Sequence, residues 1–384
     1  MPSSKMTKMI GGVLYITILM LSGPVYADYT LNMTQSVTAV GHDVYDLHML
    51  VLWIVTIVGV VVFAVIIYSL INHRKSKGAS PANFHESAIV EFIWTIIPFV
   101  ILVGIAVPAT RTLLKMEDTV NPDLTIKVTG WQWMWEYEYL DNGVHFFSKL
   151  DKASNRARQR NSDTNPRSVN NYLLEVDNAM VVPVNKKVRI LTTSNDVIHS
   201  WWVPALAVKR DAIPGYINAS WFEATKTGVY RGQCAQLCGK GHGFMPIVVK
   251  VVGQDEYDLW VEKQKSMAIA SADRANKIWN KAELMMRGKH VYHAFCVACH
   301  QANGRGIPGT YPALAGSKIA TGPLDAHIDI VVNGKPGTAM QAFGAQLNAA
   351  DIAAVISFER NAFGNNTGDI VQPSKIMARP AETN

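Results

Sequence analysis

Cys-Ala-Gln-Leu-Cys-Gly-Lys-Gly-His-Gly-Phe-Met, at residues 234–245, is the stretch around which the rest of the chain is organised. Its two thiols, Cys234 and Cys238, lie close in sequence to the imidazole of His242 and the thioether of Met245. Soft and borderline ligands of this kind favour copper, zinc or iron over magnesium or calcium. Free cysteine also occurs as a small buried hydrophobe, but the three glycines of this stretch make it a poor core segment. The stretch therefore predicts a metal-binding loop.

The composition indicates a membrane protein. The 384-residue chain is 49% hydrophobic and only 17% charged, which is more apolar and less charged than an average soluble protein. Its net charge of +6 is modest and spread along the chain, so charge gives no reason to expect nucleic-acid binding. The four cysteines form two close pairs, each with a histidine just downstream, which favours ligand sets over a disulfide framework.

The N-terminal third predicts a secretory signal peptide followed by two membrane helices. Basic residues, an apolar run and small residues suggest a signal peptide over residues 1–27; a third membrane helix is the alternative, but the run is short for spanning. Two longer uncharged runs predict a transmembrane hairpin over residues 28–115, with helices at about 47–72 and 89–110. The basic segment between them belongs in the cytoplasm, which leaves the rest of the chain outside.

Glu91 lies at the cytoplasmic border of the second predicted helix. An acid at this depth is costly unless it serves a pathway or stays at the interface. The residues alone leave both roles open.

After the hairpin, the hydrophobic pattern changes to the period of two that strands show. Residues 124–128 and 187–191 alternate in this way, and prolines and glycines separate several such runs. Residues 116–262 therefore predict an all-β sandwich or barrel. The run Trp131 to Tyr139 also alternates like a strand, with more aromatic residues than a sandwich edge requires.

A small all-α domain is predicted at residues 283–366, with helices at 283–294 and 351–362. Asn348 is a candidate N-cap for the second of these helices. Before this domain, residues 255–265 have a helical pattern and the small, polar residues after them suggest a linker, which we assign to residues 263–282. Residues 367–384 are expected to form a flexible tail.

Cys296-Val297-Ala298-Cys299-His300 opens the α domain and has the C-x-x-C-H signature of c-type haem attachment. Two thiols one helical turn apart can add to the two vinyl groups, which positions His300 as the proximal iron ligand.

A sixth ligand should follow some tens of residues later. Met340, on a Gly-rich loop before the closing helix, is the preferred candidate, and His327 and Met377 are weaker ones. A thioether ligand raises the reduction potential and closes the iron to substrates, as electron transfer requires.

His199, in Asp-Val-Ile-His-Ser-Trp at residues 196–201, adds a second imidazole to the opening stretch. Two bridging thiolates, one histidine per metal and weak outer ligands would hold two coppers that share one unpaired electron. Delocalisation keeps the geometry nearly constant between oxidation states, which favours fast electron transfer.

Several motifs in order identify a resemblance to a known family. They are the hairpin, the Trp-Gln-Trp segment at 131–133, the stretch 196–201, Asp-Ala-Ile-Pro-Gly at 211–215 and the metal loop. Together they closely resemble cytochrome c oxidase subunit II over residues 28 to about 365. The appended haem domain resembles the fused form of caa-type oxidases. The resemblance implies a cupredoxin-like Greek-key fold for the all-β domain.

The resemblance also implies a ligand set. His199, Cys234, Cys238, His242 and Met245 match the ligands of a dinuclear copper centre, CuA. Gln236 matches the residue that supplies a backbone carbonyl to copper. The family usually has Glu there, whose side chain also binds magnesium at the contact with subunit I, so Gln236 puts the magnesium role in doubt.

Two further residues gain roles from the resemblance. Trp133 matches the aromatic residue through which electrons enter from an external cytochrome, although the neighbour often found as Tyr is Met134 here. Glu91 matches the acid at the mouth of a proton channel into subunit I, which favours its functional role.

The expected function is that of the electron-entry subunit of a respiratory oxygen reductase. Electrons would pass from a donor cytochrome through haem c and CuA to subunit I, where oxygen chemistry and most proton pumping occur. Subunits I and III would be partners in a bacterial inner membrane, with the CuA and haem domains on the periplasmic side.

Three alternatives are open to test. A quinol-oxidase subunit would lack the cysteine pair. A copper-binding assembly factor would lack Met245 in register and has no reason to carry a haem. A stand-alone periplasmic electron carrier would not need a hairpin with Glu91.

Overall fold

The computed structural model describes residues 32–80, 85–159, 162–335, 337–344 and 346–378. The predicted signal peptide, residues 1–27, lies outside these residues. The chain separates into two compact units, Met1–Lys115 with Pro204–Ala207, and Met116–Val203 with Val208–Asn384.

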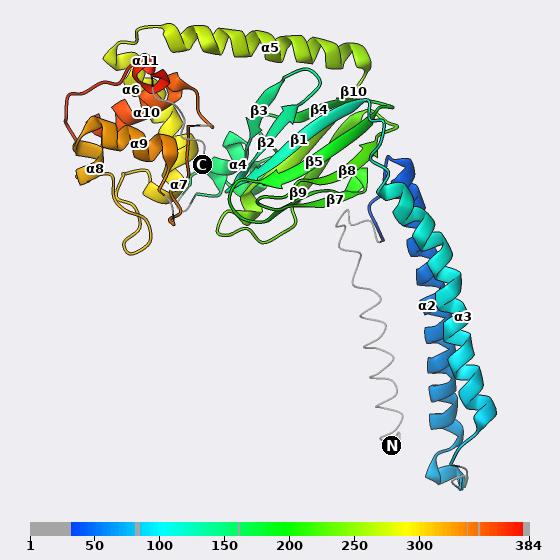
Figure 1. Ribbon diagram of the computed structural model, residues 1–384. Coiled ribbons are helices and arrows are strands. Elements are labelled where there is room, and N and C mark those ends of the chain that lie inside the picture. Colours follow the sequence, from blue (N-terminus) through cyan, green and yellow to red (C-terminus); the bar gives the residue numbers. More distant parts are fainter. Residues whose placement is uncertain (1–31, 81–84, 160–161, 336, 345, 379–384) are drawn as a thin grey trace. The chain divides into compact units, whose positions relative to one another are not determined.

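The first unit is a helical hairpin. Helices α2 (Ala39–Asn72) and α3 (Ala88–Met116) run in opposite directions, and a short 3-10 turn, η1 (Lys75–Lys77), lies between them (Figure 1). The Thr38 hydroxyl caps α2 by accepting a hydrogen bond from the Gly41 amide at 3.0 Å. Both helices extend beyond the expected ranges because a helix continues past its apolar part until a cap or turn ends it.

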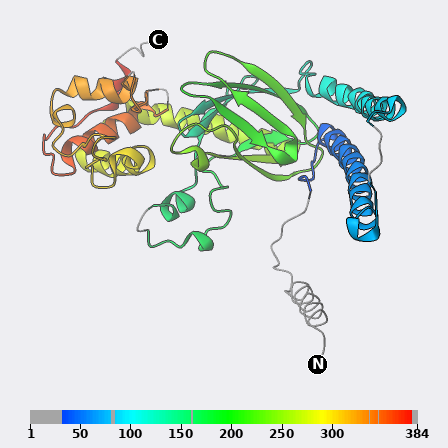
Figure 2. The ribbon, with the colours of Figure 1, turned by 90° about the horizontal axis from the view of Figure 1, so that it is seen from below.

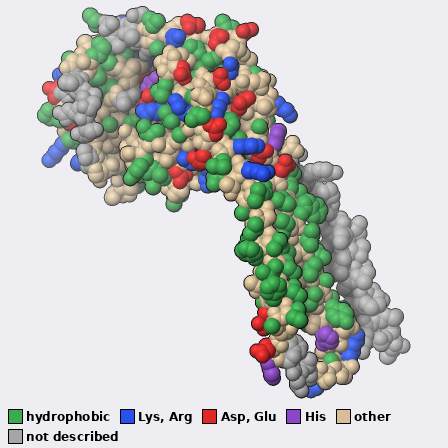
Figure 3. Space-filling model, turned by 45° about the vertical axis from the view of Figure 1, so that its right-hand side comes forward, with side chains coloured by type: hydrophobic (Ala, Val, Ile, Leu, Met, Phe, Trp, Pro, Cys, Tyr) green, Lys and Arg blue, Asp and Glu red, His purple; other side chains and the backbone are tan. Residues whose placement is uncertain are grey.

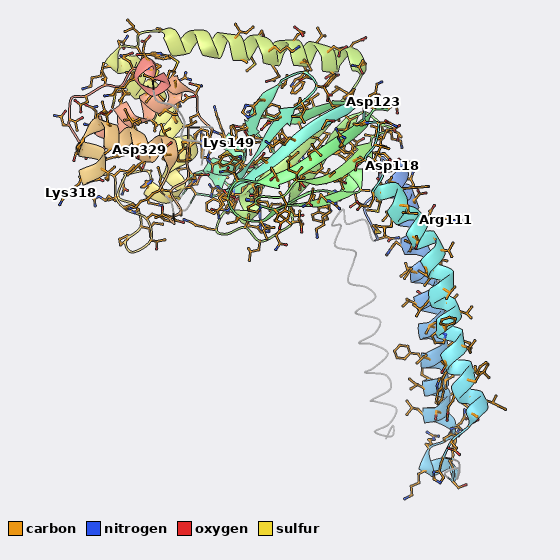
Figure 4. All side chains as sticks on the ribbon, in the orientation of Figure 1. Arg111, Asp118, Asp123, Lys149, Lys318 and Asp329 are labelled. Atoms are coloured by element: carbon orange, nitrogen blue, oxygen red, sulfur yellow. The ribbon has the colours of Figure 1, made fainter. Side chains whose placement is uncertain are left out.

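Both helices are long and apolar enough to cross a membrane. Their most apolar windows have mean hydropathies of 3.2 and 2.4, and neither window is buried within the chain. Figure 3 shows apolar side chains covering the visible face of the hairpin. Charged residues resume at Arg111 on α3 (Figure 4), and near that end Lys115 Nζ lies 2.6 Å from Asp43 Oδ2.

The second unit begins with a β-sandwich, as the sequence predicts. One sheet has the order β3-β2-β1-β5-β8, and the other has the order β4-β10-β9-β6-β7. The strands are β1 (Leu124–Trp131), β2 (Met134–Tyr139), β3 (His145–Ser148), β4 (Met180–Pro183), β5 (Lys187–Ser194), β6 (His199–Val203), β7 (Val208–Ala212), β8 (Asn218–Glu223), β9 (Gly228–Cys234) and β10 (Pro246–Val252).

At residues 131–139 the structure differs from the single strand that the alternation predicts. Residues 131–139 are not a single strand, because β1 ends at Trp131, β2 begins at Met134, and the two residues between them form the turn of an antiparallel hairpin. Within β2, inward-facing and outward-facing side chains alternate as predicted, and the inward-facing Trp135, Tyr137 and Tyr139 are at most 1% exposed. Packing in the sandwich core therefore accounts for these three aromatics, while Trp133 at the turn stays partly exposed.

A long connection joins β3 to β4 and stands apart from the sheets (Figure 2). It contains helix α4 (Lys152–Ala157) and a 3-10 turn, η2 (Pro166–Ser168). The Asp151 carboxylate caps α4 by accepting a hydrogen bond from the Ala153 amide at 2.8 Å. Ser154 is fully buried and its hydroxyl accepts from the Leu173 amide at 3.2 Å. Part of this connection therefore packs as a folded element.

Most of the predicted linker is helical, because it belongs to helix α5 (Gln254–Asn276). The expected helix ended at Lys265, whereas α5 continues through most of the segment assigned to a linker at 263–282 (Figure 1). Residues 266–276 contain no glycine or proline and are rich in alanine, the best helix former. Residues 265–270 are exposed, so the helix forms there without an apolar face.

The C-terminal helical region has a core of its own. Its elements are α6 (Lys281–Val291), a π-helical turn η5 (Tyr292–Cys296), α7 (Val297–His300), α8 (Lys318–Thr321), α9 (Leu324–Asn333), α10 (Ala349–Asn361) and α11 (Pro373–Met377). The Asn348 side chain caps α10 by accepting from the Asp351 amide at 3.0 Å, as predicted. At Gly288 on α6, a Cβ would lie 2.1 Å from the Ala354 carbonyl oxygen, so glycine permits α6 to cross α10 closely.

The predicted tail is also corrected. Val371 and Ile376 are 1% and 7% exposed and belong to the helical core, and the Val371 amide donates to the Ser357 hydroxyl at 2.8 Å. These apolar side chains bind the segment to α10, and the flexible-tail assignment of 367–384 is wrong as far as residue 378. Residues 379–384 lie outside the described part of the chain.

Candidate functional site

The predicted metal ligands meet at one end of the sheet that contains β6, β9 and β10. His199 begins β6, Cys234 ends β9, and Met245 directly precedes β10. The loop from β9 to β10 carries Cys238 and a 3-10 turn, η4 (His242–Phe244). Since β9 lies between β6 and β10, the strand ends bring together residues that are far apart in sequence.

Two thiols form the centre of this site. Cys234 Sγ and Cys238 Sγ are 3.9 Å apart, and both cysteines are free and buried. His199 Nδ1 lies 4.0 Å from Cys234 Sγ, and His242 Nδ1 lies 3.6 Å from Cys238 Sγ. Each thiol therefore has its own imidazole.

Weaker donors complete the arrangement. Met245 Sδ lies 3.6 Å from Cys238 Sγ, and the backbone oxygen of Gln236 lies 3.3 Å from Cys234 Sγ. The Gln236 residue itself is exposed. The donors fit two soft metal ions that share two thiolates, with one imidazole and one weak donor available to each.

Asp196 fixes the orientation of His199. Asp196 Oδ1 lies 2.8 Å from His199 Nε2, which leaves Nδ1 of the same ring facing the thiols. Asp196 Oδ2 accepts a hydrogen bond from the Gln132 amide at 2.7 Å, so one carboxylate links the imidazole to the aromatic turn. A carboxylate partner of this kind sets the tautomer of a metal-binding histidine. The role of Asp196 does not follow from the sequence, although an acid three residues before a candidate histidine is a signal that points to it.

The thiols differ in acidity. A hydrogen bond with the Cys238 thiol holds the pKa of Cys234 well below its usual value, against the opposing effect of burial. The hydrogen bond with Cys234 raises the pKa of Cys238, and burial raises it further. The opposite directions reflect the repulsion between two adjacent thiolates, which makes loss of the second proton harder than loss of the first. A cation at the thiols would favour release of the second proton.

Burial alone would lower the pKa of His199, but hydrogen bonds with Asp196 and Cys234 outweigh it and raise the pKa above the ordinary value.

The turn between β1 and β2 contacts the metal loop. Trp133 Nε1 donates to the Cys238 carbonyl oxygen at 3.1 Å, and Gln132 Nε2 donates to the same oxygen at 2.9 Å. The Trp133 indole is partly exposed, so it has one edge on the loop and one open to solvent. At Gly241, a Cβ would lie 2.2 Å from Trp133 Cδ2, so the indole can pack here only against glycine.

Gly241→Ala is expected to displace the Trp133 indole and to destabilise the folded chain by about 1–3 kcal/mol, the usual cost of overpacking. The φ of Gly241 is −95°, which alanine adopts without strain, so the effect would come from the clash. Gly243→Ala is the matched control, because nothing lies within 4 Å of its Cβ position. Denaturant titration would measure both variants. Equal stability of the two would contradict this packing.

The predicted haem ligands open the helical region. Cys296 ends η5, and Cys299 and His300 lie on α7. Both thiols are free, and His300 Nδ1 is 2.9 Å from the Pro312 carbonyl oxygen. As donor to that oxygen, Nδ1 fixes the ring and leaves Nε2 available as a ligand atom. Burial raises the pKa of the Cys296 thiol well above its usual value.

The three candidate axial ligands lie in different settings. Met340 is on a loop whose Lys335 amide donates to the Met340 carbonyl oxygen at 2.8 Å, and its side chain packs on the same core as Cys296. His327, on α9, is 2% exposed and its Nε2 lies 2.9 Å from Glu359 Oε2. Met377 ends α11 and is 49% exposed. Of the three, only Met340 combines a loop position with contact to the core that holds Cys296.

Glu91 belongs to the hairpin unit and lies apart from these sites in the chain. It is exposed in the first turn of α3, where its Oε1 lies 3.4 Å from the Ser87 amide nitrogen.

Comparison with protein families gives three matches along the chain. Residues 27–112 match the model described as cytochrome c oxidase subunit II, transmembrane domain. Residues 124–252 match cytochrome c oxidase subunit II, periplasmic domain. Residues 283–358 match cytochrome c oxidase, cbb3-type, subunit III.

Named relatives agree with these matches. The probable cytochrome c oxidase subunit 2 of Rickettsia bellii is 38% identical over 261 residues, which is 68% of this chain and 93% of the relative. Cytochrome c oxidase subunit 2 of Cereibacter sphaeroides is 37% identical over 60% of this chain and 78% of the relative. The crystal structure of the periplasmic domain of subunit II of cytochrome oxidase from Bradyrhizobium japonicum is 48% identical, covers 39% of this chain and 98% of that chain, and has a TM-score of 0.34.

Proposed function

This chain belongs to the cytochrome c oxidase subunit II family, and we propose that it carries electrons to subunit I through a haem c and a dinuclear copper centre of its own. Its relatives are named as subunit 2 of cytochrome c oxidase, so the chain is a subunit of an oxidase. The chain joins a membrane anchor, a cupredoxin-like sandwich and a cytochrome c domain. Oxygen chemistry and most proton translocation would belong to subunit I.

The single observation that carries the proposal is the pair of buried thiols at 3.9 Å, each with an imidazole Nδ1 directed at it. His199, Cys234, Cys238, His242 and Met245, with the backbone oxygen of Gln236, would hold the copper. The bound coppers would supply a one-electron relay with little change in geometry. Asp196 would hold His199 in its binding tautomer, and the two thiolates would balance part of the metal charge.

In the helical domain, Cys296 and Cys299 would bind haem c covalently. His300 would be the proximal ligand, oriented by its hydrogen bond to the Pro312 oxygen. Met340 would supply a thioether ligand to the iron, since its side chain packs on the same core as Cys296. When bound, the haem supplies one-electron chemistry, and the apolar core beside Cys296 would exclude water from it.

The remaining assignments follow from the same proposal. Trp133 would be the aromatic contact for incoming electrons, since its indole touches the carbonyl of a copper ligand and keeps an exposed edge. Glu91 would stand at the entrance of a proton channel in subunit I. A magnesium ion at the subunit I contact depends on the exposed Gln236 side chain, which provides an amide oxygen in place of a carboxylate.

A donor cytochrome and subunit III would be further partners, and no nucleic acid is expected. The apolar hairpin anchors the chain in a membrane with the sandwich outside. We propose the bacterial inner membrane, spanned twice, with both cofactor domains on the periplasmic side.

The alternatives do not account for all of the donors. A copper-binding assembly factor has no use for two thiols with separate imidazoles and a thioether, nor for a haem domain. A stand-alone electron carrier has no use for the hairpin. A quinol oxidase would lack Cys234 and Cys238.

Metal analysis and electron paramagnetic resonance of the purified membrane complex test the proposal. We expect two coppers per chain from this site, sharing one unpaired electron, and one covalent haem per chain. A single labile copper would refute the dinuclear centre and favour an assembly factor.

A further inference from the structure

A second group of metal-binding side chains lies on the β1–β2–β3 part of the sandwich, separate from the thiol pair. Glu136 and Glu138 alternate along β2 and therefore share a face, the opposite one from Tyr137. His145 on β3 is the cross-strand partner of Glu138. One ligand atom from each of the three lies within 4.8 Å of the others. We call these three residues the hairpin cluster.

One carboxylate of the cluster is already fixed. Glu136 is 8% exposed, and its Oε2 accepts from Trp131 Nε1 at 2.8 Å while its Oε1 lies 2.7 Å from His145 Nε2. Immobilising a metal ligand in advance reduces the entropy lost on binding. The side chains of Glu138 and His145 are 31% and 44% exposed, so an ion can reach them from solvent.

Thr129 provides an independent observation at the same place. It is 6% exposed, and its hydroxyl has no hydrogen-bond partner within the described chain. Its cross-strand partner is Glu136, so its side chain lies on the face of the hairpin cluster. Buried hydroxyls nearly always have a partner, and a metal-bound water beside Glu136 would supply one.

Lys127 neutralises part of the cluster. Its Nζ lies 3.1 Å from Glu138 Oε1, and both side chains are about one-third exposed. Such surface ion pairs contribute little and exchange readily with solvent. The Lys127 ammonium can therefore move away when a divalent cation takes its place, but its positive charge would oppose binding.

We propose that Glu136, Glu138 and His145 form a binding site for a divalent metal ion of the zinc type. An imidazole nitrogen with two carboxylate oxygens suits zinc better than calcium or magnesium, which prefer oxygen alone. Three protein ligands leave one position for water, on the face where the Thr129 hydroxyl lies. The site needs neither copper nor haem, so it stands apart from the proposed electron path.

Zinc binding to the purified, copper-loaded oxidase complex tests this site. Zn²⁺ alone is the probe, measured by equilibrium dialysis and by X-ray absorption at the zinc edge. We expect one zinc per chain bound by nitrogen and oxygen. His145→Ala and Glu138→Gln should each weaken binding at least ~10-fold, as losing even an outer-shell partner does. Lys127→Gln should strengthen binding, because it removes the opposing charge.

Matched controls separate this site from general surface binding. His290→Ala and Glu262→Gln replace exposed residues of the same types on other elements and should leave zinc affinity unchanged. Unaltered copper content and circular dichroism would show that the variants are folded. Sulfur in the zinc shell, absence of stoichiometric zinc, or unchanged affinity in both His145→Ala and Glu138→Gln would each overturn the proposal.

Discussion

Cys238→Ser is expected to abolish the shared-electron copper signal and to lower oxidase turnover with a cytochrome donor at least about 100-fold. Cys238 Sγ lies within 4 Å of three other candidate donors, those of Cys234, His242 and Met245. Serine removes the soft, bridging donor and leaves a hydroxyl that copper binds weakly. The loss should exceed the ~10–100-fold that follows from removing an outer-shell partner.

Cys299→Ser is the matched control for this variant. It makes the same chemical change at the haem motif, where the second thiol, Cys296, and the candidate ligand His300 remain. We expect this variant to keep both coppers and to alter only the haem attachment. Copper and haem contents of the two purified complexes, with their paramagnetic resonance spectra, measure the difference. A dinuclear signal that survived Cys238→Ser would mean that Cys238 does not bridge.

The sequence could predict the architecture because each kind of element leaves its own pattern in the sequence. Uncharged runs marked the hairpin, alternation marked the sandwich, and an Asn cap marked α10. Element ends were harder, since caps and turns decide them locally. Thr38 extends α2 well beyond the apolar run, and the Gln132 and Trp133 turn divides what looks like one strand.

The predicted copper ligands could be listed from sequence because the chain has only four cysteines and its motifs resemble those of a known family. Their mutual geometry could not, since His199 reaches the loop only through the β6–β9–β10 order. The roles of Asp196 and Gly241 also depend on contacts across the fold. Asp196, in the connection between β5 and β6, meets Gln132 across 64 residues of sequence, and Gly241 faces an indole that no local pattern places there.

Helix α5 and the C-terminal segment show a different limit. A helix is recognised in sequence by its apolar face. The C-terminal half of α5 needs no such face because it is exposed up to residue 270, so the sequence pattern indicates a linker there. Among residues 365–378, the buried apolar residues are Val371, Pro373 and Ile376. Three such residues in a polar context give too weak a signal to predict packing on α10.

Met340→Ala is expected to lower the haem reduction potential by at least ~100 mV, within the roughly 0.8 V range that axial ligation spans. A thioether ligand stabilises reduced iron relative to oxidised iron, and alanine cannot replace it. Covalent haem should persist, because Cys296 and Cys299 are unchanged. Electron delivery should then slow while copper content stays normal. Redox titration of the haem absorbance in the purified complex measures the potential.

Met377→Ala is the matched control for the axial ligand. Met377 is 49% exposed at the end of α11, whereas Met340 is partly buried against the core that holds Cys296. We therefore expect Met377→Ala to leave the potential unchanged. An unchanged potential in Met340→Ala would transfer the assignment to His327, whose Nδ1 has no partner in the described chain but whose Nε2 is held by Glu359. Breaking that buried pair would cost stability, so ligation by Met340 is the arrangement that leaves the core of α9 and α10 intact.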